Sequence, residues 1–152
     1  MANLVYKRKF YCERNDVSIP FESKSIGSHK DAATLLRAIY EKEGLDVGIN
    51  ESCFVVFINA HNLPVGYYKV SEGGLSSTTI DNKMIVKSAL DCFASGVLLC
   101  HNHPSGSATP SKADIQSTEK LMRCLNVFEI QLLDHIILSE DEAYSFVLKT
   151  LF

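Results

Sequence analysis

The sequence predicts a single α/β domain in which helices pack on a mixed β-sheet. Short apolar runs are typical of buried strands, and amphipathic stretches with helical spacing alternate with them. The 152 residues, of which 46% are hydrophobic, suffice for one sizeable core. We expect residues 1–152 to form one domain, with an N-terminal strand and helix over 1–44 and the core over 45–152.

The first half of the chain carries one predicted helix and two predicted strands. Asp31 begins a stretch with apolar residues at helical spacing, which ends near Gly44. The apolar run 53–58 predicts a buried strand. A turn at 62–64 then leads into a second strand over 65–70.

The second half of the chain alternates between helices and strands. Asp81 is expected to cap a helix, and the apolar run 97–100 predicts a buried strand. Ser111 is expected to cap another helix, and 130–138 and 144–148 are predicted to form closing strands. The inward face of the helix after Ser111 is predicted to carry Ile115, Thr118, Leu121, Met122 and Leu125.

Composition and charge argue against a membrane protein and against a nucleic-acid surface. The net charge is −3, and the basic cluster 7–9 is short enough to be a solvated strand edge. The longest purely apolar run, 54–58, is far shorter than the roughly 20 residues of a membrane-spanning helix. The N-terminus lacks the apolar stretch of a signal peptide, and the five cysteines are scattered. We therefore expect a soluble, cytoplasmic protein without a membrane partner.

Two histidines at the end of the strand over 97–100 predict a metal site. His101 and His103 are two residues apart, so their imidazoles share one face of an extended strand. Two such imidazoles suit a borderline metal such as zinc. The following loop can bring Asp114, in the first turn of the next helix, back to the strand end. Cys100 and Asn102 are expected to point the other way, and Asn102 to anchor the loop backbone.

Three protein ligands leave a fourth position for water, as in a catalytic zinc site. A carboxylate outside the ligand set usually moves the protons, and Glu51 at the start of a strand is the candidate. Ser111 could donate a hydrogen bond to an oxyanion or only cap its helix. A solvated role for Glu51 and an ordinary capping role for the Ser111–Asp114 pair stay open from these residues alone.

Other polar residues are weaker candidates for the metal site. His135 follows Asp134 in an apolar strand, where it could support a metal-binding histidine or be a satisfied core residue. Cys53 could lie near the site but fits the core. His29 and His61 fit surface or turn positions.

At these residues the chain resembles the JAMM, or MPN-plus, metalloprotease family, and in particular its RadC-like branch. The family pattern is a Glu before a strand, then His-x-His-Pro and Ser-x-x-Asp, and it is met by Glu51, His101, His103, Ser111 and Asp114. The strings at 101–106 and 133–135 are similar to the RadC-like branch. The resemblance implies a deaminase-like three-layer fold, one zinc ion per chain and hydrolysis of a peptide or isopeptide bond. It also implies a general-base role for Glu51 and an oxyanion-donor role for Ser111.

Three functions remain open at this point. The first is a zinc-dependent hydrolase of an amide bond. The second is a DNA-repair enzyme or accessory that acts on or near nucleic acid, which the acidic net charge does not favour. The third is a binding module without catalysis, against which the intact Glu51 and Ser111 argue.

Overall fold

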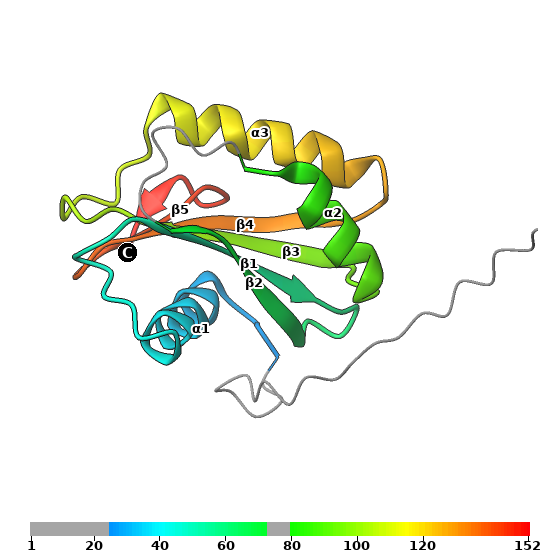
Figure 1. Cartoon of the computed structure of the whole chain (residues 1–152), viewed down its shortest axis with the longest axis horizontal. Helices are drawn as coiled ribbons and strands as arrows, with labels where there is room; N and C mark the ends of the chain where they lie inside the picture. Colours follow the sequence, from blue (N-terminus) through cyan, green and yellow to red (C-terminus); the bar gives the residue numbers. More distant parts are fainter. Residues whose placement is uncertain (1–24, 73–79) are drawn as a thin grey trace, which may run out of the picture.

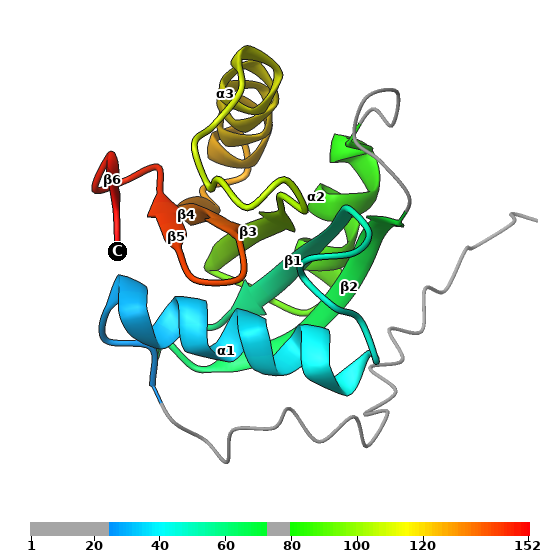
Figure 2. The same cartoon turned by 90° about the vertical axis from the view of Figure 1, so that its left-hand side faces the viewer.

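The computed structural model describes residues 25–72 and 80–152, which form three layers (Figure 1). Helix α1 (His29–Lys42) covers one face of a central sheet, as the end-on view in Figure 2 shows. Helices α2 (Asn82–Asp91) and α3 (Lys112–Asn126) cover the other face. The predicted α/β class, a mixed sheet flanked by helices, is confirmed and is consistent with a deaminase-like three-layer fold.

The sheet contains parallel and antiparallel pairs. Its spatial order is β2-β1-β3-β4-β5-β6, and only β3 and β4 pair in parallel among the described strands. A parallel pair needs a crossover, which α3 supplies. The strands are β1 (Ser52–Ile58), β2 (Pro64–Glu72), β3 (Gly96–Asn102), β4 (Gln131–Leu138), β5 (Ala143–Ser145) and β6 (Thr150–Leu151).

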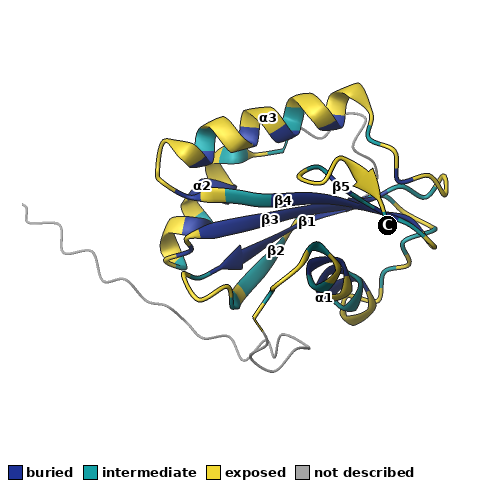
Figure 3. Ribbon diagram, turned by 180° about the vertical axis from the view of Figure 1, so that it is seen from behind, coloured by how far each residue is buried: buried dark blue, intermediate teal, exposed yellow. Residues whose placement is uncertain are grey.

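The two faces of the sheet bury separate apolar clusters. Because side chains alternate along a strand, Phe54 and Cys100 face α1, whereas Val55 and Leu99 face α2 and α3. Every residue of β1 and β3 is buried, and Figure 3 shows these central strands between the helical layers. The end of β3 is therefore a rigid platform for the side chains that follow it.

The loop after β3 returns the chain to the sheet. The backbone N–H of His103 donates to the carbonyl oxygen of Leu138 on β4 (2.8 Å), which extends the strand pairing by one residue. The loop turns at Gly106, whose φ of +86° favours glycine. Ser111 then caps α3, and its hydroxyl accepts from the backbone N–H of Asp114. The predicted cap is confirmed, and it places the first turn of α3 beside the end of β3.

Several sequence predictions differ from the structure. The strand expected over 144–148 is shorter, because Ser145 and Asp134 side chains accept the N–H groups of Leu148 and Val147 and turn the chain before β6. Ile115 and Met122, expected inward on α3, are 43% and 42% exposed.

The strand and the basic cluster expected within 1–24 lie outside the described residues. None of the helices among the described residues has the length and apolar character that a bilayer requires.

Asn102 ties the end of β3 to the loop before β1. Its side chain is fully buried on the α1 face, opposite the histidines, as predicted. The amide nitrogen donates to the carbonyl oxygens of Val47 (2.7 Å) and Asn50 (2.8 Å), and the amide oxygen accepts from the backbone N–H of Ser52 (2.7 Å). The hydroxyl of Tyr40 on α1 donates to the carbonyl oxygen of Ser52 (2.6 Å) and lies 3.1 Å from the same amide oxygen. The three bonds to backbone groups fix the chain on both sides of residue 51.

We expect Asn102→Ala to lower the free energy of unfolding by about 2–4 kcal/mol, because it leaves buried donors and acceptors unsatisfied. Urea denaturation measures this change. Asn59→Ala is the matched control, since the Asn59 side chain also accepts two backbone N–H groups but in a turn at the surface. A loss of the same size in both variants would contradict the anchoring role of Asn102.

Candidate metal centre

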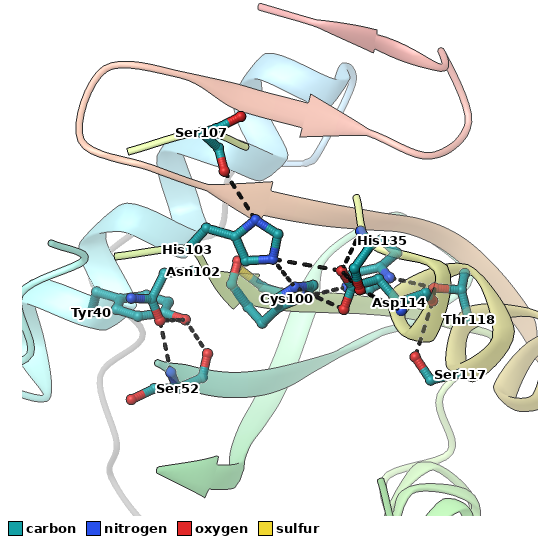
Figure 4. Close-up of polar contacts among 12 residues, drawn as sticks. Tyr40, Ser52, Cys100, Asn102, His103, Ser107, Asp114, Ser117, Thr118 and His135 are labelled. Atoms are coloured by element: carbon teal, nitrogen blue, oxygen red, sulfur yellow. Dashed lines mark hydrogen bonds and ion pairs between the residues drawn. The ribbon is translucent and has the colours of Figure 1, made fainter. Parts of the chain in front are cut away.

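The two histidines at the end of β3 converge on one point. His101 and His103 lie on the α3 side of the sheet, and their Nε2 atoms are 3.0 Å apart. Figure 4 shows His103 beside Asp114. His101 is 1% exposed, whereas the side chain of His103 is 17% exposed, so one ring is internal and the other reaches the surface. Strand alternation predicted this arrangement and predicted that Cys100 points away from the histidines, and Cys100 indeed faces α1.

A carboxylate from α3 completes the cluster. Asp114 lies in the first turn of α3 and is 6% exposed. Its Oδ1 is 3.2 Å from Nε2 of His101, and its Oδ2 is 3.6 Å from Nε2 of His103. The backbone N–H and the hydroxyl of Ser111 both donate to Oδ2, at 2.7 and 2.6 Å. The capping box therefore orients the carboxylate toward the two imidazoles.

Glu51 approaches the same point from the loop before β1. One carboxylate oxygen of Glu51 and one nitrogen each of His101 and His103 lie within 4.8 Å of one another. The loop that carries Glu51 is the one held by Asn102 on the opposite face of the sheet. The five predicted site residues, Ser111 included, thus come together from three separate segments of the chain.

The donor set fits a divalent metal ion. In a tetrahedral zinc site with Zn–N distances of about 2.0–2.1 Å, two ligand nitrogens lie about 3.3 Å apart. The 3.0 Å separation of the two Nε2 atoms is close to that value. On its other edge, the His103 ring donates from Nδ1 to the carbonyl oxygen of Ser107 (2.9 Å), which leaves Nε2 with a lone pair. The cluster can therefore hold a metal ion.

The electrostatics of the cluster favour a cation. Burial alone would raise the pKa of Asp114, but the imidazoles of His101 and His103 and the Ser111 hydroxyl hold that pKa well below its usual range. The carboxylate is thus charged inside a poorly solvated site. Contact with Asp114 raises the pKa of His103, while partial burial opposes that shift. A metal ion would replace protons as the positive partner of Asp114.

Cys53 lies beneath the cluster as a core residue. It pairs with His101 across β1 and β3 and is fully buried. Burial, then the charges of Glu51 and Asp114, raises the pKa of its thiol, so the sulfur stays protonated. The interpretation of Cys53 as core is confirmed, and a protonated thiol is a poor metal ligand.

Sequence analysis missed two polar contacts. The hydroxyl of Thr118 on α3 lies 2.5 Å from Nδ1 of His135. His135 itself occupies the supporting position that the sequence left open, with its Nε2 2.7 Å from Nδ1 of His101. Thr118 was expected inward only as part of the helix face, so its polar role carried no separate signal. His29, expected at a surface or turn position, instead contacts the buried carboxylate of Asp134 through Nδ1 at 2.7 Å.

Comparison with known proteins agrees with this geometry. The family model described as a RadC-like JAB domain matches residues 26–151. A "UPF0758 protein" of Flavobacterium johnsoniae is 36% identical over 129 residues, which cover 85% of this chain and 54% of that protein. A "UPF0758 protein" of Clostridium beijerinckii is 38% identical over 120 residues, which cover 79% of this chain and 50% of that protein.

This chain spans about half the length of the curated relatives that it matches. The family match covers α1, all six strands of the sheet and the metal cluster. The resemblance drawn from the His-x-His-Pro and Ser-x-x-Asp motifs is therefore confirmed, and the chain belongs to the RadC-like JAB domain family.

Proposed function

We propose that this domain is a zinc-dependent hydrolase that cleaves a peptide or isopeptide bond. The observation that carries the proposal is the convergence of His101, His103 and Asp114 within 3.0–3.6 Å, with the Glu51 carboxylate alongside. Two nitrogens and one oxygen from protein leave a fourth tetrahedral position for water, as catalytic zinc sites do. Membership of the RadC-like JAB domain family supports the same chemistry.

Each residue then has a defined task. The two imidazoles and Asp114 would hold a zinc ion, which would supply a Lewis acid that acidifies water and polarises the scissile carbonyl. Glu51 accepts a proton from the attacking water as the new C–O bond forms. It then passes that proton to the nitrogen of the leaving group as the C–N bond breaks, which gives a carboxylic acid and an amine.

Ser111 is the proposed donor to the oxyanion of the tetrahedral intermediate. Its hydroxyl donates to Asp114 Oδ2 in this structure, so the oxyanion role requires the hydroxyl to turn toward the substrate. The backbone N–H of Ser111 keeps its own bond to the same oxygen at 2.7 Å. Asp114 therefore stays oriented while the hydroxyl is engaged elsewhere.

A reducing compartment such as the cytoplasm is the proposed setting. Cys53 and Cys100 are free thiols, and both are fully buried as small apolar side chains. They face opposite sides of the sheet, so no disulfide could join them without rebuilding it. Free, buried cysteines are typical of proteins that are not stabilised by disulfides.

We expect the purified domain to bind about one zinc ion per chain and His103→Ala to lose most of it, since three protein ligands define the site. Elemental analysis and competition with a chromophoric chelator measure content and affinity. His61→Ala is the control, because His61 lies in the exposed turn between β1 and β2. Equal zinc content in all three proteins would contradict the assignment of the site.

We expect Glu51→Gln to reduce hydrolysis by about 10²-fold or more while the zinc content stays unchanged, since a base but not a ligand is removed. Cleavage is followed by mass spectrometry on a panel of peptides and isopeptide-linked peptides, with and without chelator. Glu41→Gln, at an exposed position of α1, is the matched control. Hydrolysis that persists in Glu51→Gln or after complete zinc removal would defeat the mechanism, and loss of zinc from Glu51→Gln would make Glu51 a ligand instead.

A further inference from the structure

We infer that His135 and Thr118 are positioning residues that hold His101 in the tautomer able to bind metal through Nε2. The inference rests on the proposed function, because it concerns the metal bound by His101. Neither residue approaches the metal position itself. They form a hydrogen-bonded chain that leads from the backbone of α3 to the far edge of the His101 ring.

A backbone carbonyl at the start of the hydrogen-bonded chain determines which group donates each bond. The oxygen of Asp114 is 2.5 Å from the hydroxyl of Thr118, and a carbonyl can only accept. The single proton of Thr118 is thereby used. The 2.5 Å contact between this hydroxyl and Nδ1 of His135 must then have the imidazole as donor.

The Nδ1 proton of His135 determines the tautomer of His101 in turn. A neutral His135 with its proton on Nδ1 offers only a lone pair at Nε2. That atom lies 2.7 Å from Nδ1 of His101, so His101 must donate from Nδ1. Nε2 of His101 then carries a lone pair, and it points to the position shared with His103 and Asp114.

His101 depends on this chain because, within residues 25–72 and 80–152, its ring has no hydrogen bond to a backbone carbonyl. His103 has its own acceptor, the carbonyl oxygen of Ser107, which fixes its tautomer directly. His101 is 1% exposed, so water does not replace a missing partner. In Figure 4, His135 and Thr118 lie on the α3 side of Asp114, away from His103.

The ring of His135 is held rigidly in its orientation. It is 1% exposed and stacks on Phe146, with ring centroids 4.5 Å apart and an interplanar angle of 8°. The preceding residue, Asp134, accepts from the backbone N–H of His135 (2.8 Å) and from the hydroxyl of Ser145 (2.6 Å). Two neighbouring residues of β4 are thus fixed on opposite faces of the sheet, and the ring that serves His101 cannot turn freely.

Metal affinity and ring tautomers together test the inference. His135→Phe keeps a flat ring against Phe146 but removes the acceptor, so we expect zinc affinity to fall about 10–100-fold. His135→Gln places an amide oxygen within reach of His101 and should restore part of that loss. Thr118→Val should weaken affinity toward the lower end of the range, about 10-fold, and Thr118→Ser should restore it.

Ser117→Ala is the matched control. The hydroxyl of Ser117 donates to the same Asp114 carbonyl (3.0 Å) without contacting His135, so its removal should leave zinc affinity unchanged. Two-bond ¹H–¹⁵N spectra of the metal-free protein, at a pH where the rings are neutral, report the tautomers. We expect the Nδ1–H form for His101 and His135 in the wild type, and the Nε2–H form of His101 in His135→Phe.

Two different failures can be told apart. If the wild type binds zinc and His135→Phe binds it equally well, with an unchanged His101 tautomer, the inference is overturned and the proposed function stands. If His135→Phe only unfolds at a lower temperature while zinc affinity is kept, the role of His135 is structural and the inference is likewise overturned. If the wild type binds no zinc, the proposed function itself fails.

Discussion

The two-residue repeat of β3 is the constraint on which the site depends. Within three consecutive residues the strand presents an imidazole to α3, an amide to α1 and a second imidazole to α3. The imidazoles of His101 and His103 form the metal cluster, while Asn102 holds the loop that carries Glu51. One short stretch of backbone therefore positions the proposed metal ligands and the proposed proton acceptor at once. A shift of one residue in register would exchange the two sets of contacts.

The polar groups behind the cluster form a satisfied network in an apolar setting. His101, His135 and Thr118 are buried between the sheet and α3, and each hydrogen bond described there has one donor and one acceptor. Unpaired groups at this depth would be costly, whereas a fully paired network is rigid. The pKa of His135 is lowered well below its usual value by burial, so its ring stays neutral and can both donate and accept.

The sequence predicts the features of the fold and the site that depend on neighbouring residues, and it fails where the pairing of distant strands decides. Local patterns sufficed for His101, His103 and the Ser111–Asp114 capping box, and for most helices and strands. The sequence left open whether His135 supports a metal-binding histidine or is a core residue, because β4 carries an irregularity, with Val97 paired to Leu132 and Leu98 paired to Asp134. Counting alternate residues from Leu132, which packs on the α3 side, places His135 on the α1 side; the irregularity reverses this.

Asp114 serves the centre twice, with its carboxylate beside the two imidazoles and with its carbonyl oxygen at Thr118. The carboxylate and the carbonyl oxygen differ in how an amino-acid substitution affects them. Any substitution at position 114 alters the carboxylate, but none except proline changes the peptide groups of a helix, and even proline keeps the carbonyl. The direction of the hydrogen bonds from Thr118 through His135 to His101 thus depends on a backbone carbonyl, which no point mutation removes. A substitution at position 114 would therefore change the charge beside the imidazoles but keep the carbonyl that orients His101 through Thr118 and His135.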